Sequence, residues 1–176
     1  MTYPTFSNGQ VLPASDLNSI GLWLVKSQTV GTGVSSVTVT GAFSADYDNY
    51  RIIYSGGVMS GANSLSMNIG GVGSSYYGSL IYCNYNASTA LAIGTNNGSN
   101  IPYVGGGDTS FAVVDIQVNN PFNALSTIVQ GQFQNNISMG SISYRLANTS
   151  SYTSFSFSTS AGTITGGTIY VYGYRK

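Results

Sequence analysis

The sequence predicts an all-β protein: an antiparallel β-sandwich, jelly-roll-like, with a short N-terminal arm and helix. Apolar and polar residues alternate with a period of two in several segments, as in strands that bury one face. Glycine and asparagine clusters separate these segments at short intervals, as turns do. No crossover helix is visible after residue 21, so we expect about ten strands in one domain over residues 22–176.

The N-terminal segment, residues 1–21, lacks the strand period. Ser15 or Asp16 can cap a short helix that Pro13 precedes and Gly21 ends. One short helix is not stable alone in water, so we expect this segment to be an attachment arm that docks on another surface. The apolar side chains that would anchor the arm are Phe6, Val11, Leu12, Leu17 and Ile20.

Seven segments after the arm have strand character. Strict alternation marks one-sided strands at residues 36–40, 65–69 and 154–158. More continuous apolar character predicts more fully buried strands at residues 50–54, 80–83, 111–118 and 169–172.

Turn residues punctuate the strands. We expect turns at residues 31–33, 56–57, 70–71, 96–98, 105–107, 119–121 and 166–167. Residues 163–165 and 168–170 flank the last of these, which predicts a hairpin with a two-residue loop.

Charge is scarce in this chain and limits its chemistry. Only 6% of the residues are charged, histidine is absent, and all five acids are aspartates. Serine–histidine and cysteine–histidine nucleophiles are therefore impossible, and we expect no enzyme activity and no cofactor. The single cysteine, Cys83, excludes an internal disulfide and a zinc site, and we expect it to be a buried, inert thiol.

The same scarcity bears on partners. Five lysine and arginine residues are too few to neutralise a nucleic-acid backbone, so we expect no nucleic-acid partner. No apolar run reaches about 18 residues, so we expect no membrane insertion.

The remaining acidic candidates are Asp46 and Asp48. If they lie two apart on a strand, their carboxylates share a face. Turn and hydrogen-bonding roles are the first interpretation, a bound cation the second and glycoside hydrolysis the third. Arg51 is close enough in sequence to pair with one of them. We expect Asp115 and Arg145, in strand-like segments, to form partly buried ion pairs or bridges between subunits.

The 14 tyrosines are the most suggestive feature for binding. They are interleaved with serine, glycine and asparagine, a composition typical of binding loops, and aromatic faces suit sugar stacking. Packing in the core or between subunits is the alternative for each. The candidates for ligand or interface contact are Tyr76, Tyr77, Tyr85, Tyr103 and Tyr152.

Three stretches together resemble tail-fibre-like virion proteins of tailed bacteriophages. Residues 6–20, FSNGQVLPASDLNSI, are similar to the G-x-x-L-x-A-x-D-L-N arm that often begins such proteins. Residues 43–54, FSADYDNYRIIY, resemble the F-x-x-x-Y-x-x-Y-R-I strand of the small β-domain that follows it. Residues 166–176, GGTIYVYGYRK, resemble the closing G-G-T-I-x-V-Y-G strand.

The resemblance implies a non-enzymatic structural protein of the virion, assembled in the host cytoplasm. It implies a homo-oligomer, most often a homotrimer, with the arm attached to other virion proteins and the β-domain projecting. The leading function is a tail-fibre or tail-tip module for receptor binding, contacting host surface glycans. The alternative is a capsid-decoration or head-fibre protein attached to the shell.

Overall fold

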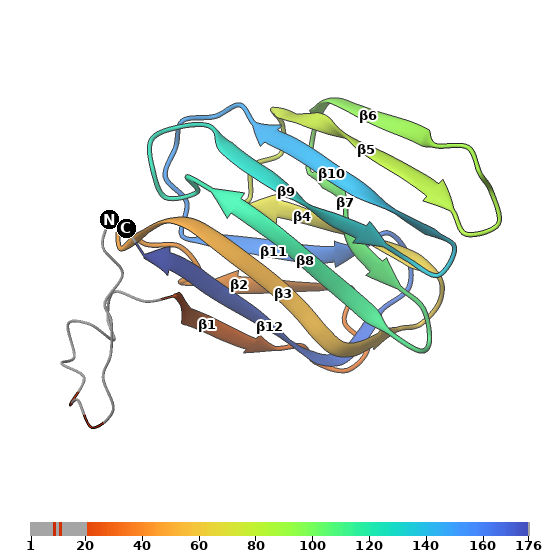
Figure 1. The fold of residues 1–176 in the computed structure, drawn as a ribbon, viewed down its shortest axis with the longest axis horizontal. Helices are drawn as coiled ribbons and strands as arrows, with labels where there is room; N and C mark the ends of the chain where they lie inside the picture. The colour runs from red at the N-terminus through yellow and green to blue at the C-terminus, as the bar shows by residue number, and fades with distance from the viewer. Residues whose placement is uncertain (1–8, 10, 12–20, 176) are drawn as a thin grey trace.

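The computed structural model describes residues 9, 11 and 21–175, and within them it contains strands and no helix (Figure 1). The all-β prediction is confirmed for this part of the chain. The helix predicted after Pro13 lies outside the described residues.

Twelve strands are present in the described part of the chain, where about ten were expected. Their bounds are β1 (Leu22–Thr29), β2 (Ser36–Thr40), β3 (Tyr47–Met59), β4 (Asn63–Ile69), β5 (Tyr76–Asn84), β6 (Leu91–Gly98), β7 (Ile101–Gly107), β8 (Ala112–Asn119), β9 (Thr127–Gln134), β10 (Ser138–Leu146), β11 (Ser154–Thr159) and β12 (Ile164–Arg175).

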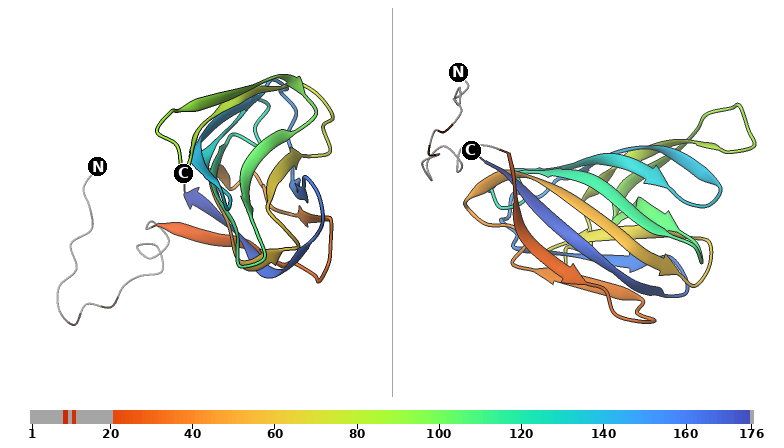
Figure 2. Two further views of the ribbon diagram at one scale, coloured as in Figure 1. Left: turned by 90° about the vertical axis from the view of Figure 1, so that its right-hand side faces the viewer. Right: turned by 60° about the horizontal axis from the view of Figure 1, so that its bottom comes forward.

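All strand pairs are antiparallel and belong to one hydrogen-bonded network that branches at β8. One edge of β8 pairs with β3. The other edge pairs with β7 over Ala112–Val114 and with β9 from Asp115 onward. Eight strands, in the order β1-β12-β3-β8-β9-β10-β5-β6, form a large layer. The branch β7-β4-β11-β2 folds behind it as a small layer (Figures 1 and 2).

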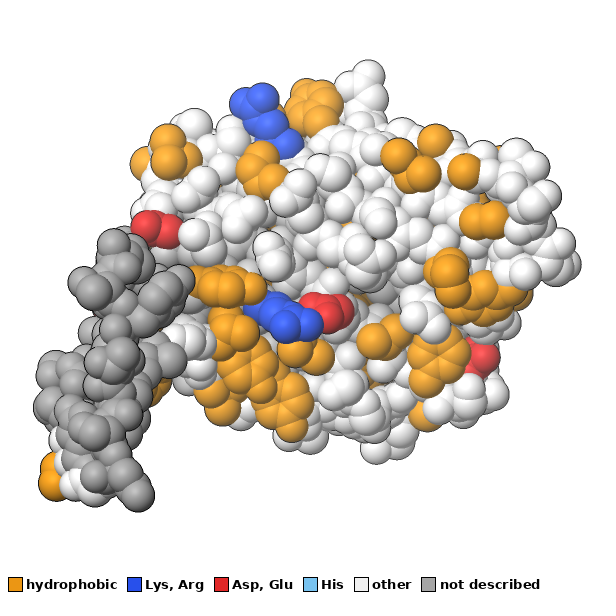
Figure 3. Space-filling model, viewed as in Figure 1, with side chains coloured by type: hydrophobic (Ala, Val, Ile, Leu, Met, Phe, Trp, Pro, Cys, Tyr) orange, Lys and Arg blue, Asp and Glu red, His pale blue; other side chains and the backbone are white. Residues whose placement is uncertain are grey.

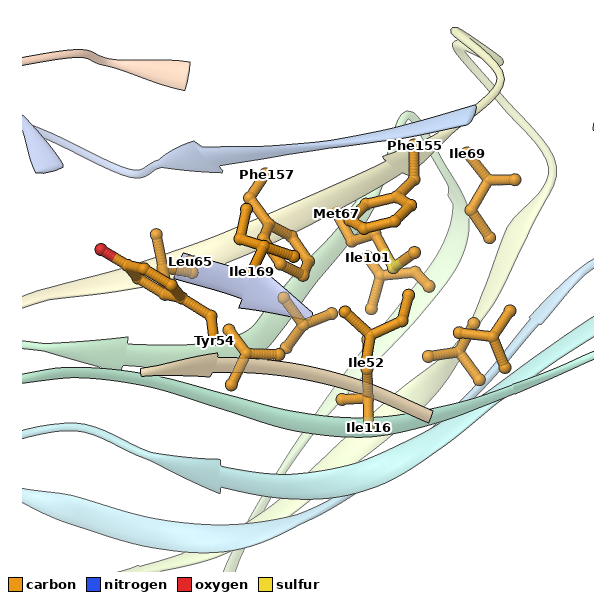
Figure 4. Close-up of a cluster of buried hydrophobic side chains, with 14 of the residues drawn as sticks. Ile52, Tyr54, Leu65, Met67, Ile69, Ile101, Ile116, Phe155, Phe157 and Ile169 are labelled. Atoms are coloured by element: carbon orange, nitrogen blue, oxygen red, sulfur yellow. The ribbon is translucent and has the colours of Figure 1, made fainter. Parts of the chain in front are cut away.

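The core lies between the two layers (Figure 4). Phe155, Phe157 and Met67 point inward from the small layer, and Ile52 and Ile116 point inward from the large layer. All five are at most 1% exposed. Burying one such side chain contributes about 1.5–3 kcal/mol, so the alternating segments of the sequence supply the main driving force for folding.

The hairpin predicted around residues 166–167 is wrong, because β12 continues through both glycines without a chain reversal. The pair Gly56-Gly57 is likewise inside β3 rather than in a turn. Gly57 lies opposite Gly166 across the two strands, and Gly56, Gly166 and Gly167 have positive φ values of 76°, 71° and 79°. Paired glycines here kink two neighbouring strands together instead of reversing the chain.

Tyr54 explains why the kink needs glycine. Its hydroxyl donates a hydrogen bond of 2.8 Å to the Gly166 carbonyl, and its ring packs over Gly57 and Gly167. A Cβ atom on Gly57 would overlap the Tyr54 hydroxyl and come within 2.5 Å of the Gly166 carbonyl oxygen. The glycines therefore make room for a buried aromatic side chain between two strands.

The other predicted turns divide into two groups. Residues 31–33 and 70–71 lie between strands, and so do residues 120–121, with Asn119 the last residue of β8 and Asn120 at a φ of 58°. Residues 96–98 and 105–107 instead form the last residues of β6 and β7, so the turn prediction is wrong there. At Gly105 a side chain would overlap the Val113 carbonyl, so glycine permits a close approach of β7 to β8.

Candidate functional site

The outward side of the small layer carries hydroxyl and amide groups. In β4 the buried Leu65 and Met67 alternate with Ser64 and Ser66, which therefore face outward. The same alternation in β2 and β11 produces a surface without formal charge, which we call the hydroxyl face. Its side chains are Ser36, Thr38, Thr40, Ser64, Ser66, Asn68, Ser154, Ser156 and Ser158.

A groove of about 560 Å³ lies at the edge of this face, and we call it the hydroxyl groove. The Ser66 hydroxyl donates to the Ser158 carbonyl at 3.2 Å, and the Ser64 amide donates to the Ser160 hydroxyl at 3.2 Å. None of the lining residues is charged. The groove is lined in the main by Ser64, Ser66, Asn100, Tyr103, Ser158 and Ser160.

Tyr103 is the aromatic side chain of the hydroxyl groove. It projects from β7 and is half-buried. Its ring meets Phe133 edge to face, with ring centroids 5.7 Å apart and an interplanar angle of 80°. This packing holds the ring in place, so Tyr103 can offer a fixed aromatic surface at the groove.

Two of the five candidate tyrosines, Tyr76 and Tyr152, belong to the core. They are 0% and 7% exposed. The Ile69 amide donates a 2.8 Å hydrogen bond to the Tyr76 hydroxyl oxygen, and burial raises the pKa of Tyr76 to about 12. The Tyr152 ring packs against Gly70, which has no Cβ to displace it. Both rings are therefore packed in the core.

The other two candidates, Tyr77 and Tyr85, lie on β5 and just after it, and are 40% and 50% exposed. The Tyr85 hydroxyl donates to the Asn135 carbonyl at 3.0 Å, and that of Tyr77 donates to Asn97 Oδ1 at 3.4 Å. Both are accessible, and neither lines the hydroxyl groove.

Asp46 and Asp48 have separate partners. Asp46 lies in the turn before β3, where the Ser44 hydroxyl donates to its Oδ2 at 3.0 Å. Asp48 lies in β3 and accepts a 2.9 Å hydrogen bond from the Asn123 amide. The structure thus gives both carboxylates hydrogen-bonding roles. Among the described residues there is no cluster of three or more metal-ligating side chains.

Arg51 forms a bidentate ion pair with Asp115, not with the aspartates near it in sequence. The Arg51 Nε and Nη2 atoms donate to the two carboxylate oxygens at 2.9 and 2.7 Å, from β3 to β8. The hydrogen bonds that the guanidinium donates to the Asp115 carboxylate raise the pKa of Arg51. Arg145 instead donates to the Ser126 hydroxyl at 3.1 Å. Both side chains of the ion pair are over a third exposed, so it contributes no more than about 1 kcal/mol to stability.

A surface rich in hydrophobic side chains lies beside this ion pair on the outward side of the large layer (Figure 3). In β12 the buried Ile169 and Val171 alternate with partly exposed tyrosines, whereas the sequence predicts a more fully buried strand at residues 169–172. The signal that sequence analysis missed is the Tyr-x-Tyr-x-Tyr alternation at the end of the chain. We call this surface the tyrosine face; it consists of Arg51 and Asp115 together with the neighbouring Leu22, Leu24, Ile53, Tyr170, Tyr172 and Tyr174.

The remaining sequence candidates are the arm and Cys83. Phe6, Leu12, Leu17 and Ile20 lie outside the described residues, and Val11 is 88% exposed. Cys83 is half-buried rather than buried, because it lies near the end of β5, and its thiol donates to the Ala87 carbonyl at 3.0 Å.

Comparison with models of protein families, with curated protein sequences and with solved structures finds no match to this chain. Within the residues that the structure describes, no helix has the length and apolar character needed to cross a membrane.

Proposed function

We propose that the chain is a non-enzymatic structural and recognition protein of a tailed-bacteriophage virion. In this proposal it is a tail-fibre or tail-tip module, attached through residues 1–21, that contacts neutral host surface glycans. The observation that carries the glycan part is the uncharged hydroxyl groove with its fixed aromatic ring. The virion part is supported by the three sequence motifs that resemble tail-fibre-like proteins.

The chemistry of the hydroxyl groove matches that of a neutral sugar. A sugar ring presents hydroxyl groups that both donate and accept hydrogen bonds, together with apolar C–H faces. Serine hydroxyls and the Asn100 amide also donate and accept, and the Tyr103 ring can contact a C–H face. Because no charge takes part, binding is expected to change little with ionic strength.

We also propose that the folded-over sheet is a jelly-roll-like β-sandwich. Two layers of antiparallel strands enclose a single core, which supports this class. A sandwich suits the proposed role because it presents a rigid outer face while the arm remains available for attachment.

Replacing Asn100 by arginine is expected to block the hydroxyl groove. A long charged side chain would fill part of it and remove the amide, so binding to a neutral oligosaccharide array should fall at least about tenfold. The matched control is Thr40→Arg, which adds the same charge to an exposed position of the same layer away from the groove. If Asn100→Arg binds as the unmodified protein does, the groove is not the glycan site.

Labelling the protein on intact virions should place it on the tail. Electron microscopy with an antibody against the chain gives the position directly. A label on the head would favour the alternative, a capsid-decoration or head-fibre protein, and would contradict the tail assignment.

A further inference from the structure

The tyrosine face combines exposed leucines with partly exposed tyrosines in one place. Leu22 and Leu24 on the edge strand β1 are 41% and 55% exposed. Beside them the Tyr170 and Tyr172 rings stack at a centroid distance of 6.3 Å. In the strand register Leu24 lies opposite Tyr172, so the apolar side chains form one continuous patch rather than isolated contacts.

The composition and layout of this face are those of a protein–protein interface. Tyrosine and arginine are enriched among the residues that carry binding energy in interfaces. Glutamines border the patch: Gln117 Nε2 donates to the Tyr174 hydroxyl at 3.5 Å, and Gln130 and Gln132 line a shallow groove beside the ion pair. The apolar patch on β1 and β12 thus lies beside an ion pair and uncharged amides, a mixture of aromatic, aliphatic and polar surface that is common in faces covered in an assembly.

The charges select the partner. One cation, Arg51, and one anion, Asp115, lie side by side on the tyrosine face. A partner surface of a single sign would repel one of them. The same face of another copy, turned by a two-fold axis between the two charges, places each arginine opposite the other copy's aspartate. We propose that the tyrosine face is the docking surface for a second copy of this chain, in a two-fold, face-to-face dimer rather than the homotrimer that the sequence resemblance implies.

The dimer forms through the face and not by strand addition at β1. Lys26 lies in the middle of this edge strand, and the pairing of β1 with β12 is irregular between Leu24 and Lys26. A lysine and a bulge are both devices that prevent edge-to-edge pairing. The outward side chains of β1 are thus available while its backbone edge is protected.

Leu24→Lys is the direct test, measured by sedimentation or light scattering of the full chain over a range of concentrations. The unmodified protein should show a dimer, and the variant a dissociation constant raised at least about 30-fold. The control is Leu125→Lys, because Leu125 is 56% exposed, almost the same as Leu24, but lies outside the tyrosine face. Leu125→Lys should leave the dimer unchanged.

The ion pair gives a second test that does not depend on Leu24. Arg51→Glu places like charges opposite one another and should weaken the dimer, whereas the exchange Arg51→Asp with Asp115→Arg restores complementarity and should restore it. A monomer at every concentration would overturn the proposal. So would a trimer, or a dimer that Ile81→Lys, at the far end of the large layer, dissociates while Leu24→Lys does not. Glycan binding at the hydroxyl groove is independent of each outcome.

Discussion

Alanine at Gly57 is expected to lower the free energy of unfolding by about 3 kcal/mol or more. The new Cβ atom would overlap the Tyr54 hydroxyl and crowd the Gly166 carbonyl oxygen. Tyr54 is 1% exposed, and a shift of its ring away from Gly57 would strain or break its hydrogen bond to Gly166. Either the ring or the β3–β12 pairing must shift, and chemical denaturation measures the cost.

Two other glycines separate this steric effect from the general effect of glycine replacement. Gly94 lies in β6 with open space around its Cβ position, so Gly94→Ala should change stability by less than about 0.5 kcal/mol. Gly166 also has open space but a φ of 71°, so Gly166→Ala should cost about 1–2 kcal/mol through backbone strain alone. If Gly57→Ala behaves like Gly94→Ala, the packing of Tyr54 against the kink is not as described.

The same kink shows why part of the fold was predictable and part was not. Alternation of apolar and polar residues depends only on which face is buried, so residues 65–69 and 154–158 were placed correctly within β4 and β11. A glycine pair does not by itself show whether the chain turns or continues as a strand. It serves equally well in a turn, as at residues 70–71, or inside a kinked strand, as at Gly56-Gly57. Only the opposing glycines of β12 distinguish the two cases, and that pairing is a tertiary contact.

The candidate surfaces were also only partly predictable from the sequence. Tyrosine composition predicts that some rings are accessible, but burial depends on which layer covers each strand: Tyr77 is exposed while its neighbour Tyr76 is completely buried. The hydroxyl groove brings together residues from β4, β11 and the start of β7, which lie far apart in the sequence. The ion pair between Arg51 and Asp115 likewise joins residues 64 positions apart, whereas nearness in sequence favoured Asp46 or Asp48.

Stability is expected to fall steeply between pH 10 and pH 12. Burial raises the pKa of both Tyr54 and Tyr76 to about 12, from the ordinary value near 10. Below pH 10 both groups keep their protons in the folded and unfolded states, so their contribution is fully present. Between pH 10 and pH 12 mainly the unfolded chain loses them, which by pH 12 favours unfolding by about 2 kcal/mol for each tyrosine. Urea unfolding at intervals from pH 8 to pH 12 measures this loss.

Tyr54→Phe separates the two roles of the buried hydroxyl, as a hydrogen-bond donor and as a group that resists ionisation. Removing the hydroxyl lowers the free energy of unfolding at pH 8 but reduces the loss of that free energy near pH 12. At pH 8 the variant leaves the Gly166 carbonyl without its donor and should be less stable by about 1–3 kcal/mol. Toward pH 12 it lacks one group that must be kept protonated, so its stability should fall by about 2 kcal/mol less than that of the unmodified protein. The two curves of unfolding free energy against pH should therefore converge or cross. Tyr85→Phe, at a ring that is 50% exposed, should follow the unmodified curve throughout. Parallel curves for Tyr54→Phe would mean that alkaline unfolding starts elsewhere than at the kink of β3 and β12.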